Sequence, residues 1–154
     1  MLTLLFYIGD VMYTIKCEKV REIVPMVSLM EVPHTPEFFA GYFNYRGTIV
    51  PVIDLCRLIL GCPCQMRLST RIILVDYKGK GDASHILGLT AERVTETARK
   101  PDDAFSSPGI RSKEAPFLGG IVMENDQMIQ YLDLDRLPDC IDFLPGGSDV
   151  SVDN

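Results

Sequence analysis

The chain has 154 residues, 47% of them hydrophobic, and its 15 basic and 21 acidic residues leave a net charge of −6. This composition is typical of a folded globular protein and excludes an intrinsically disordered chain. Lys and Arg form no run that could follow a phosphate backbone, so the sequence argues against nucleic acid as a partner.

The apolar start of the chain, residues 1–8, predicts a first β-strand. It has no basic segment and no small-residue cleavage site, which argues against a signal peptide. No segment approaches the roughly 20 apolar residues that a membrane span requires. We therefore expect a cytoplasmic protein without direct membrane insertion.

The first 36 residues contain strand patterns followed by a proline-rich segment. Residues 2–8 and 11–15 predict a hairpin that turns at Gly9-Asp10. Residues 16–20 fit a helical turn, and periodicity does not decide between a turn and a strand for residues 20–24. Three prolines between residues 25 and 36 predict an extended segment that crosses the fold.

The sequence GYFNYRGTIVPVIDL, residues 41–55, predicts a β-hairpin. Aromatic and β-branched residues form its two arms around a turn at residues 44–47, where Gly47 can adopt a positive φ. Pro51 removes one backbone donor from the second arm, so we expect that strand at a sheet edge or with a bulge. An edge strand is available to a partner.

Short helical turns are expected on both sides of this hairpin. Before it, Thr35 is placed to cap a turn over residues 35–40. After it, Asp54 is placed to cap a helical turn over residues 55–60, which Gly61 ends.

The second half of the chain repeats the alternation of strands and turns. Residues 70–77 and 84–89 predict a hairpin, and residues 117–124 and 127–132 predict another. Residues 91–100 are compatible with a strand, but their propensities favour a helix. The remaining expected elements are a surface loop over residues 101–116 and an acid-started helical turn at residues 133–137.

Six or more short strands at intervals of about 8 to 12 residues predict an all-β sandwich or a pair of small barrels. Both halves of the chain contain a hairpin whose second arm enters a short acidic turn, over residues 49–55 and 128–134. This parallel favours two related barrels over one sandwich.

Five cysteines at irregular spacing, in a chain without an export signal, do not predict a disulfide framework. Cys62 and Cys64 suggest the alternative of a small β-barrel protein that binds a metal or another ligand. Zinc sites usually have a longer gap within a thiolate pair and a second pair elsewhere. Buried or unreactive thiols are therefore the favoured interpretation, and we expect neither a metal nor a cofactor.

The sequence contains no nucleophile elbow, Walker loop or dinucleotide fingerprint, so it predicts a protein that is not an enzyme. Glu22 and Arg46 stand out because each is surrounded by apolar residues, where an unpaired charge is costly. One hypothesis is that they form an ion pair, in which case Arg46→Ala lowers thermal stability. The other is that Arg46 projects into solvent from the turn.

The motif Asn44-Tyr45-Arg46-Gly47, followed by Val50-Pro51-Val52 and Asp54-Leu55, is shared with a known family. Further similar segments are LLFYIGDVMYTI, VREIVPMVSLMEVPHTPEFFA, HILGLTAERV and LGGIVMENDQMIQYLDLDRL. On these residues the chain resembles the CheW-like domain family, the coupling proteins of bacterial chemotaxis arrays.

The resemblance implies an all-β fold of two SH3-like five-stranded β-barrels with short helical turns. Residues 1–145 would form one CheW-like domain of two intertwined barrel subdomains. These subdomains are expected at roughly residues 15–70 and at 71–132 plus the N-terminal strand. Residues 146–154 are expected to be a disordered tail.

The resemblance also implies a non-catalytic adaptor at membrane-associated receptor arrays. Its expected partners are the regulatory domain of a CheA-type histidine kinase and the cytoplasmic tips of methyl-accepting chemotaxis receptors. Arrays that control swimming and arrays that control surface attachment or a second messenger both fit. The residues expected to bind these partners are Val20, Glu22, Gly41, Asn44, Arg46 and Gly47.

Overall fold

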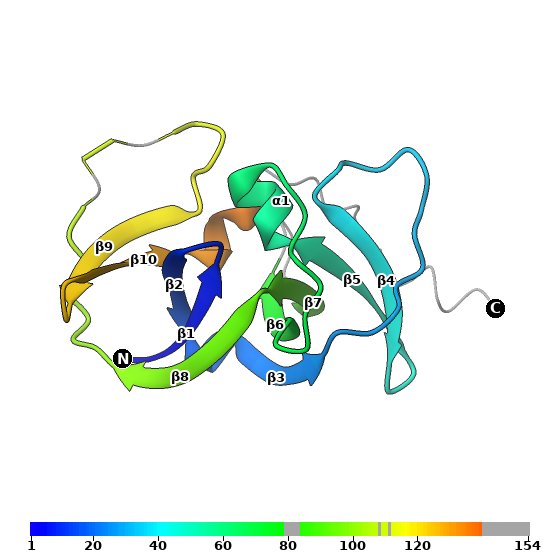
Figure 1. Cartoon of the computed structure of the whole chain (residues 1–154), viewed down its shortest axis with the longest axis horizontal. Helices are drawn as coiled ribbons and strands as arrows, with labels where there is room; N and C mark the ends of the chain where they lie inside the picture. Colours follow the sequence, from blue (N-terminus) through cyan, green and yellow to red (C-terminus); the bar gives the residue numbers. More distant parts are fainter. Residues whose placement is uncertain (79–83, 108, 111, 140–154) are drawn as a thin grey trace.

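The structure is a computed structural model that describes residues 1–78, 84–107, 109–110 and 112–139. Within these residues the chain forms two five-stranded sheets, which lie side by side in Figure 1. We call them barrel 1 and barrel 2. The expected all-β fold of two five-stranded barrels is confirmed.

Barrel 1, on the right of Figure 1, has the strand order β3-β6-β7-β5-β4. Its elements are β3 (Val20–Pro25), β4 (Phe39–Tyr45), β5 (Thr48–Asp54), β6 (Arg71–Lys78) and β7 (Ser84–Ala91). Strands β5 and β7 are parallel, and the other neighbours are antiparallel. The helix α1 (Leu55–Leu60) follows β5 and lies above the region between the barrels.

Barrel 2, on the left, has the order β8-β1-β2-β10-β9. Its strands are β1 (Leu2–Ile8), β2 (Val11–Lys16), β8 (Arg93–Arg99), β9 (Leu118–Glu124) and β10 (Gln127–Leu132). A short 3-10 helix, η1 (Cys17–Lys19), leads from β2 to β3, and a second, η2 (Leu134–Asp139), follows β10.

Each barrel combines strands from both halves of the chain. The β1–β2 hairpin pairs with β8 and β10, whereas the β6–β7 hairpin pairs with β3 and β5. The two halves have therefore exchanged their first hairpins. The expected division at residue 70 does not separate the sheets, because β6 and β7 complete barrel 1 and β1 and β2 complete barrel 2. The expected tail, residues 146–154, lies outside the described residues.

The parallel between the two halves extends to their hydrogen bonds. The β4–β5 and β9–β10 hairpins align without a gap at an offset of 79 residues, so that Asp54 corresponds to Asp133. The amide of Asp54 donates to the Phe38 carbonyl at 2.7 Å, and that of Asp133 to the Phe117 carbonyl at 2.8 Å. The sequence signal for two related barrels thus reflects an equivalent local structure.

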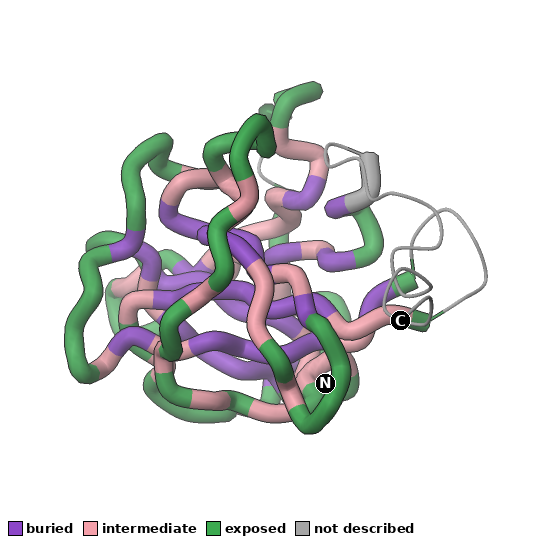
Figure 2. Tube along the Cα trace, turned by 90° about the vertical axis from the view of Figure 1, so that its right-hand side faces the viewer, coloured by how far each residue is buried: buried purple, intermediate pink, exposed green. Residues whose placement is uncertain are grey.

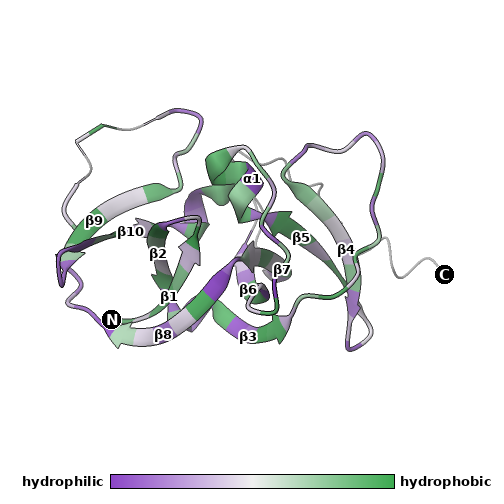
Figure 3. Ribbon diagram, viewed as in Figure 1, coloured by the Kyte–Doolittle hydropathy of each residue, from purple (hydrophilic) through white to green (hydrophobic). Residues whose placement is uncertain are grey.

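One large apolar core lies between the barrels. It receives alternate side chains of β1, Leu4, Phe6 and Ile8, whereas Leu5 points to a separate small core of barrel 2. Barrel 1 has its own small core around Val50. In Figure 2 the buried segments run through the centre of the molecule, and in Figure 3 α1 is largely hydrophobic. Burial of this shared core joins the two barrels into one folding unit.

Three local predictions were wrong. Residues 93–99 form β8 instead of a helix, because pairing with β1 outweighs helix propensity. Residues 35–38 form a non-helical turn, and the Thr35 hydroxyl donates to the Val32 carbonyl at 2.9 Å instead of capping a helix. The strand containing Pro51 is interior, between β4 and β7, and its pairing with β7 begins only at Val52.

Candidate partner-binding surface

The turn between β4 and β5 carries the residues that the sequence singled out. Tyr45 pairs with Thr48, and the two intervening residues have positive φ angles, 51° at Arg46 and 88° at Gly47. This is the pattern of a type I′ turn, whose twist matches that of the flanking strands. The Asn44 carboxamide oxygen accepts a hydrogen bond from the Gly47 amide at 2.7 Å. Asn44 and Gly47 therefore shape the turn that presents Arg46.

Glu22, Tyr45 and Arg46 form a cluster that connects the two edge strands of barrel 1, β3 and β4. Arg46 Nη2 lies 3.2 Å from Glu22 Oε1, and the Tyr45 hydroxyl donates to Glu22 Oε2. The Arg46 guanidinium lies 5.2 Å from the centre of the Tyr45 ring, within cation–π range. We call these three residues the seam cluster.

The seam cluster is partly exposed, with Arg46 open to solvent and Glu22 and Tyr45 half-buried. The Arg46 side chain is 74% exposed and that of Glu22 35%. The predicted ion pair is confirmed, and Arg46 also projects into solvent, so the two hypotheses hold together. An exposed pair contributes only about 0 to 1 kcal/mol to folding, so the cluster has little structural value. Its charges remain available to a partner.

Tyr45 keeps its proton in this setting. Its hydrogen bond to Glu22 is the main cause that raises the pKa of Tyr45 above its ordinary value of 10.0, and burial adds to it. The hydroxyl is therefore a stable donor at neutral pH. From the sequence, Tyr45 was predicted only to form a strand and the turn that follows it. Tyr45 precedes Arg46 and follows Phe43 by two residues, and Phe43 and Tyr45 pack on the same small core. This spacing is the signal that could have identified Tyr45 as a member of the site.

Gly41 and Val20 support this surface without joining the seam cluster. Gly41 is buried at a φ of 138°, and a Cβ atom there would lie 2.6 Å from the Met30 carbonyl oxygen. Met30 forms a bridge to Tyr42 along the outer side of β4. Val20 pairs with Val75 and packs against the shared core. In the free chain both residues therefore contribute to packing of the backbone and the core.

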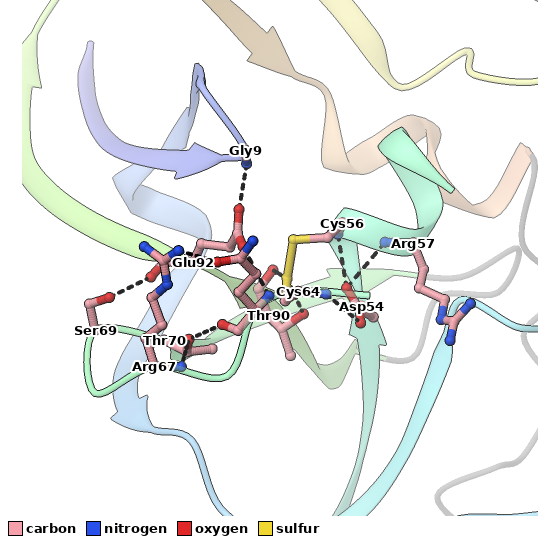
Figure 4. The surroundings of a disulfide bond; sticks show 11 residues. Gly9, Asp54, Cys56, Arg57, Cys64, Arg67, Ser69, Thr70, Thr90 and Glu92 are labelled. Atoms are coloured by element: carbon pink, nitrogen blue, oxygen red, sulfur yellow. Dashed lines mark hydrogen bonds between the residues drawn. A yellow bond between two sulfur atoms is a disulfide. The ribbon is translucent and has the colours of Figure 1, made fainter. Parts of the chain in front are cut away.

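Asp54 organises a second, buried polar site at the start of α1 (Figure 4). Its Oδ1 accepts hydrogen bonds from the amides of Cys56 and Arg57 at 2.9 and 3.2 Å, and its Oδ2 accepts one from Cys64 at 3.3 Å. Gly61 ends the helix with a φ of 80°. The predicted cap and helix end are confirmed.

Cys56 and Cys64 form a disulfide beside Asp54, with Cα atoms 5.0 Å apart. The expectation of unpaired thiols was wrong for these two residues, because folding brings the helix and the following connector together. Cys62 is exposed and has a free thiol, so Cys62 and Cys64 do not act as a pair.

The same site contains a potential set of metal ligands. Among the described residues, one group brings three such side chains within 4.8 Å, and it consists of Asp54, Cys56 and Cys64. The two sulfurs are bonded to each other, whereas zinc requires thiolates. The Asp54 oxygens already accept three backbone hydrogen bonds. The arrangement therefore fits a structural cap.

Glu92 connects the two barrels next to this site. One carboxylate oxygen accepts from the Gly9 amide at 2.6 Å, in the β1–β2 turn of barrel 2. The other accepts from the Gln65 amide at 2.9 Å, in the connector that follows α1. No motif in the sequence indicated this role, since Glu92 and its two partners come from distant segments.

The chain is similar to known proteins over most of its length. The model of the CheW-like domain matches residues 2–140. The chain is 31% identical to the chemotaxis protein CheW of Helicobacter pylori over 134 residues, covering 86% of this chain and 78% of that protein. It is 29% identical to protein FrzA of Myxococcus xanthus, covering 86% and 81%.

A solved structure has the same fold. The crystal structure of the scaffolding protein TtCheW from Thermoanaerobacter tengcongensis superimposes with a TM-score of 0.77 at 29% identity, covering 88% of this chain and 86% of that one. In the part of the chain described here, no helix has both the length and the apolar character needed to cross a bilayer.

Proposed function

The chain belongs to the CheW-like domain family and has the role of a chemotaxis coupling adaptor, and we propose that it joins receptor tips to a CheA-type histidine kinase. The proposed contacts are with the regulatory domain of the kinase and with the cytoplasmic tips of methyl-accepting receptors. The protein would accordingly work in the cytoplasm, at membrane-associated receptor arrays.

The observation that carries this proposal is the seam cluster. Glu22 and Arg46, two of the positions that the family resemblance assigns to coupling, lie 3.2 Å apart on the surface of barrel 1. A partner that supplies a carboxylate to Arg46 or a donor to Glu22 gains charge-assisted hydrogen bonds there. Asn44 and Gly47 hold the turn, and Gly41 and Val20 hold the strands beneath it.

An adaptor of this kind acts by binding alone. It biases the kinase by binding one arrangement of the array more tightly than another, with no covalent step. An exposed polar cluster provides modest affinity for a single contact, and repetition of the contact in an array raises the overall strength. The Cys62/Cys64 ligand-binding alternative gains no support, because Cys64 is bonded to Cys56.

Calorimetric titration with the regulatory domain of a CheA-type kinase from the same source tests the proposal. We expect saturable micromolar binding to the wild-type chain and at least a tenfold weaker affinity for Arg46→Ala, about 1.4 kcal/mol. The matched control is Asn125→Ala. Asn125 occupies the same turn position in barrel 2 at a φ of 50°, so both variants place Ala at nearly the same positive φ.

The control variant is expected to bind within a factor of two of the wild type. Equal weakening by the two variants would assign the effect to turn geometry and contradict a role for the Arg46 side chain. Absence of binding to the kinase by the folded wild-type chain would overturn the kinase contact.

A further inference from the structure

Three of the cysteines lie within nine residues of each other in the sequence, and they differ sharply in exposure. Cys56, in the first turn of α1, is 1% exposed, and Cys64 is 6% exposed; these two form the disulfide. Cys62 is exposed and free. A buried disulfide therefore lies next to an accessible thiol in the connector, residues 61–70.

The position of the disulfide matters for access. Both of its cysteines belong to the shared apolar core and are at most 6% exposed, so the folded chain shields the bond from small thiols in solvent. Cys62 is two residues from Cys64, at most about 7.6 Å between Cα atoms, because each step along the chain spans about 3.8 Å. The exposed thiol can thus approach the bond by local movement of the connector.

We propose that Cys56, Cys62 and Cys64 form a thiol–disulfide exchange site, in which Cys62 transfers redox equivalents between low-molecular-weight thiols and the buried Cys56–Cys64 bond. In the cytoplasm disulfides are usually transient or redox-sensing. The use of this rule for Cys56–Cys64 rests on the cytoplasmic location proposed above. The exchange chemistry itself is independent of the adaptor function.

Reduction proceeds by three exchanges. The Cys62 thiolate attacks Cys56 Sγ, the Cys56–Cys62 bond forms, and Cys64 leaves as a thiolate that takes up a proton. A small thiolate then attacks Cys62 Sγ and releases Cys56. A second small thiolate attacks the sulfur of the bound small molecule, which leaves as a symmetrical disulfide and frees Cys62. Two thiols are oxidised and the protein disulfide accepts two electrons; oxidation is the reverse.

The contacts of Cys64 favour its role as the leaving group. The Thr90 hydroxyl lies 3.4 Å from Cys64 Sγ, where it can donate to the sulfur as negative charge develops. The bond formed with Cys56 would close a loop over residues 56–62. The alternative bond between Cys62 and Cys64 has only Pro63 between its cysteines, which leaves Cys56 as the target that the chain geometry favours.

The redox state of the Cys56–Cys64 pair is expected to control the mobility of the connector. The disulfide fixes the connector to α1, and Glu92 binds the β1–β2 turn at Gly9 (Figure 4). Glu92 also accepts a hydrogen bond from the Gln65 amide in the connector. Reduction removes the covalent fixation. We expect at least tenfold faster amide hydrogen exchange over residues 62–66 in the reduced chain than in the oxidised one.

The test follows oxidation of the reduced, folded full-length chain by oxidised glutathione, with acid quenching, alkylation and peptide mapping. The wild type is expected to form the Cys56–Cys64 bond through a transient adduct on Cys62. Cys62→Ser is expected to form it at least tenfold more slowly. Two control variants that each remove one other thiol, Cys17→Ser and Cys140→Ser, are expected to form the bond at the wild-type rate. Thermal melting establishes that each variant is folded.

Two results would overturn the proposal. One is a Cys62→Ser rate within a factor of two of the wild type, or an equal slowing in either control. The other is failure of the wild-type chain to form the Cys56–Cys64 bond at any ratio of oxidised to reduced glutathione. Neither result depends on a kinase or receptor, so the adaptor function is tested separately.

Discussion

The two barrels have equivalent strands and turns, but different side chains lie where the two edge strands of each barrel meet. In barrel 1, Glu22 meets Tyr45 and Arg46 at an exposed seam. In barrel 2 the position of Glu22 is held by Glu96, which also follows a bulge in its strand, and Tyr45 is replaced by Glu124. Two carboxylates at this seam cannot attract each other, and Glu124 pairs with Lys100 instead.

The difference extends to exposure. The side chain of Lys100 is 8% exposed, whereas that of Arg46 in the seam cluster of barrel 1 is 74% exposed; the two glutamates differ little, at 42% for Glu124 and 35% for Glu22. Barrel 2 thus uses its charges for folding. The charges of the seam cluster in barrel 1 contribute little to folding, which is why we propose that the partner-binding surface lies there.

The largest expected effect compares two equivalent glycines of the edge strands. Gly41→Ala is expected to cost about 3 to 5 kcal/mol and Gly120→Ala about 2 kcal/mol, because only Gly41 adds backbone strain to overpacking. A Cβ would meet a carbonyl oxygen at 2.6 Å in one case and at 2.7 Å in the other, but only Gly41 has a positive φ. Urea unfolding measures both, and equal costs would contradict the role of φ.

A smaller effect is expected at the two equivalent aspartates. Asp54→Ala is expected to destabilise the fold by about 2 to 3 kcal/mol, because it removes the cap of α1 and leaves the buried Cys64 amide without an acceptor. Asp133 accepts a hydrogen bond from Asp135 at an exposed position, so Asp133→Ala should cost about 0.5 to 1 kcal/mol. Unfolding midpoints check this order, and a reversed order would contradict it.

The ion pairs of the two seams should differ in the same direction. Glu124→Gln leaves Lys100 unpaired and is expected to cost about 1 to 2 kcal/mol, less than a fully buried pair because Glu124 is 42% exposed. Arg46→Ala should cost at most about 1 kcal/mol. In 1 M NaCl the Arg46 effect should vanish, whereas most of the Glu124 effect should persist. Thermal melting of both variants at two salt concentrations tests this contrast.

The smallest effect concerns two tyrosines at alkaline pH. The pKa of Tyr77, in barrel 1, is raised to about 12 by burial. The pKa of Tyr131, in barrel 2, is also about 12, through burial and the nearby carboxylates of Asp133, Asp135 and Glu18. Both pKa values lie above the ordinary value of 10, so between pH 10 and 12 these tyrosines ionise more readily in the unfolded chain than in the folded one. Their contribution to the free energy of unfolding is therefore fully present below pH 10 and is lost as the pH rises towards 12.

Salt should distinguish these two causes. High salt screens the carboxylates and is expected to lower the pKa of Tyr131 while leaving that of Tyr77 nearly unchanged. Absorbance at 295 nm during alkaline titration of Tyr77→Phe and Tyr131→Phe reports the remaining tyrosines. An identical response to salt in the two variants would show that the carboxylates have no influence.

Local patterns predicted most of the strands, and the reason is physical. The aromatic and β-branched arms around Asn44-Tyr45-Arg46-Gly47 and the Asp54 cap depend on residues close in sequence, and both formed as expected. The similarity between residues 49–55 and 128–134, each a strand that enters a short acidic turn, also pointed to two related barrels.

Features that depend on distant residues were missed. The exchange of hairpins places β6 beside β3, which no local pattern encodes. Residues 93–99 form a strand despite their helix propensity, because they pair with β1. The contact of Tyr45 with Glu22 and the disulfide of Cys56 with Cys64 arise only when separate segments meet in the fold.

Amide hydrogen exchange of the chain, free and bound to the kinase regulatory domain, tests the central claim most directly. We predict protection at residues 20–22 and 42–48 of barrel 1, with residues 121–127 of barrel 2, the equivalent of residues 42–48, unchanged. Protection confined to residues 121–127, with the seam cluster of barrel 1 exchanging as in the free chain, would contradict this claim.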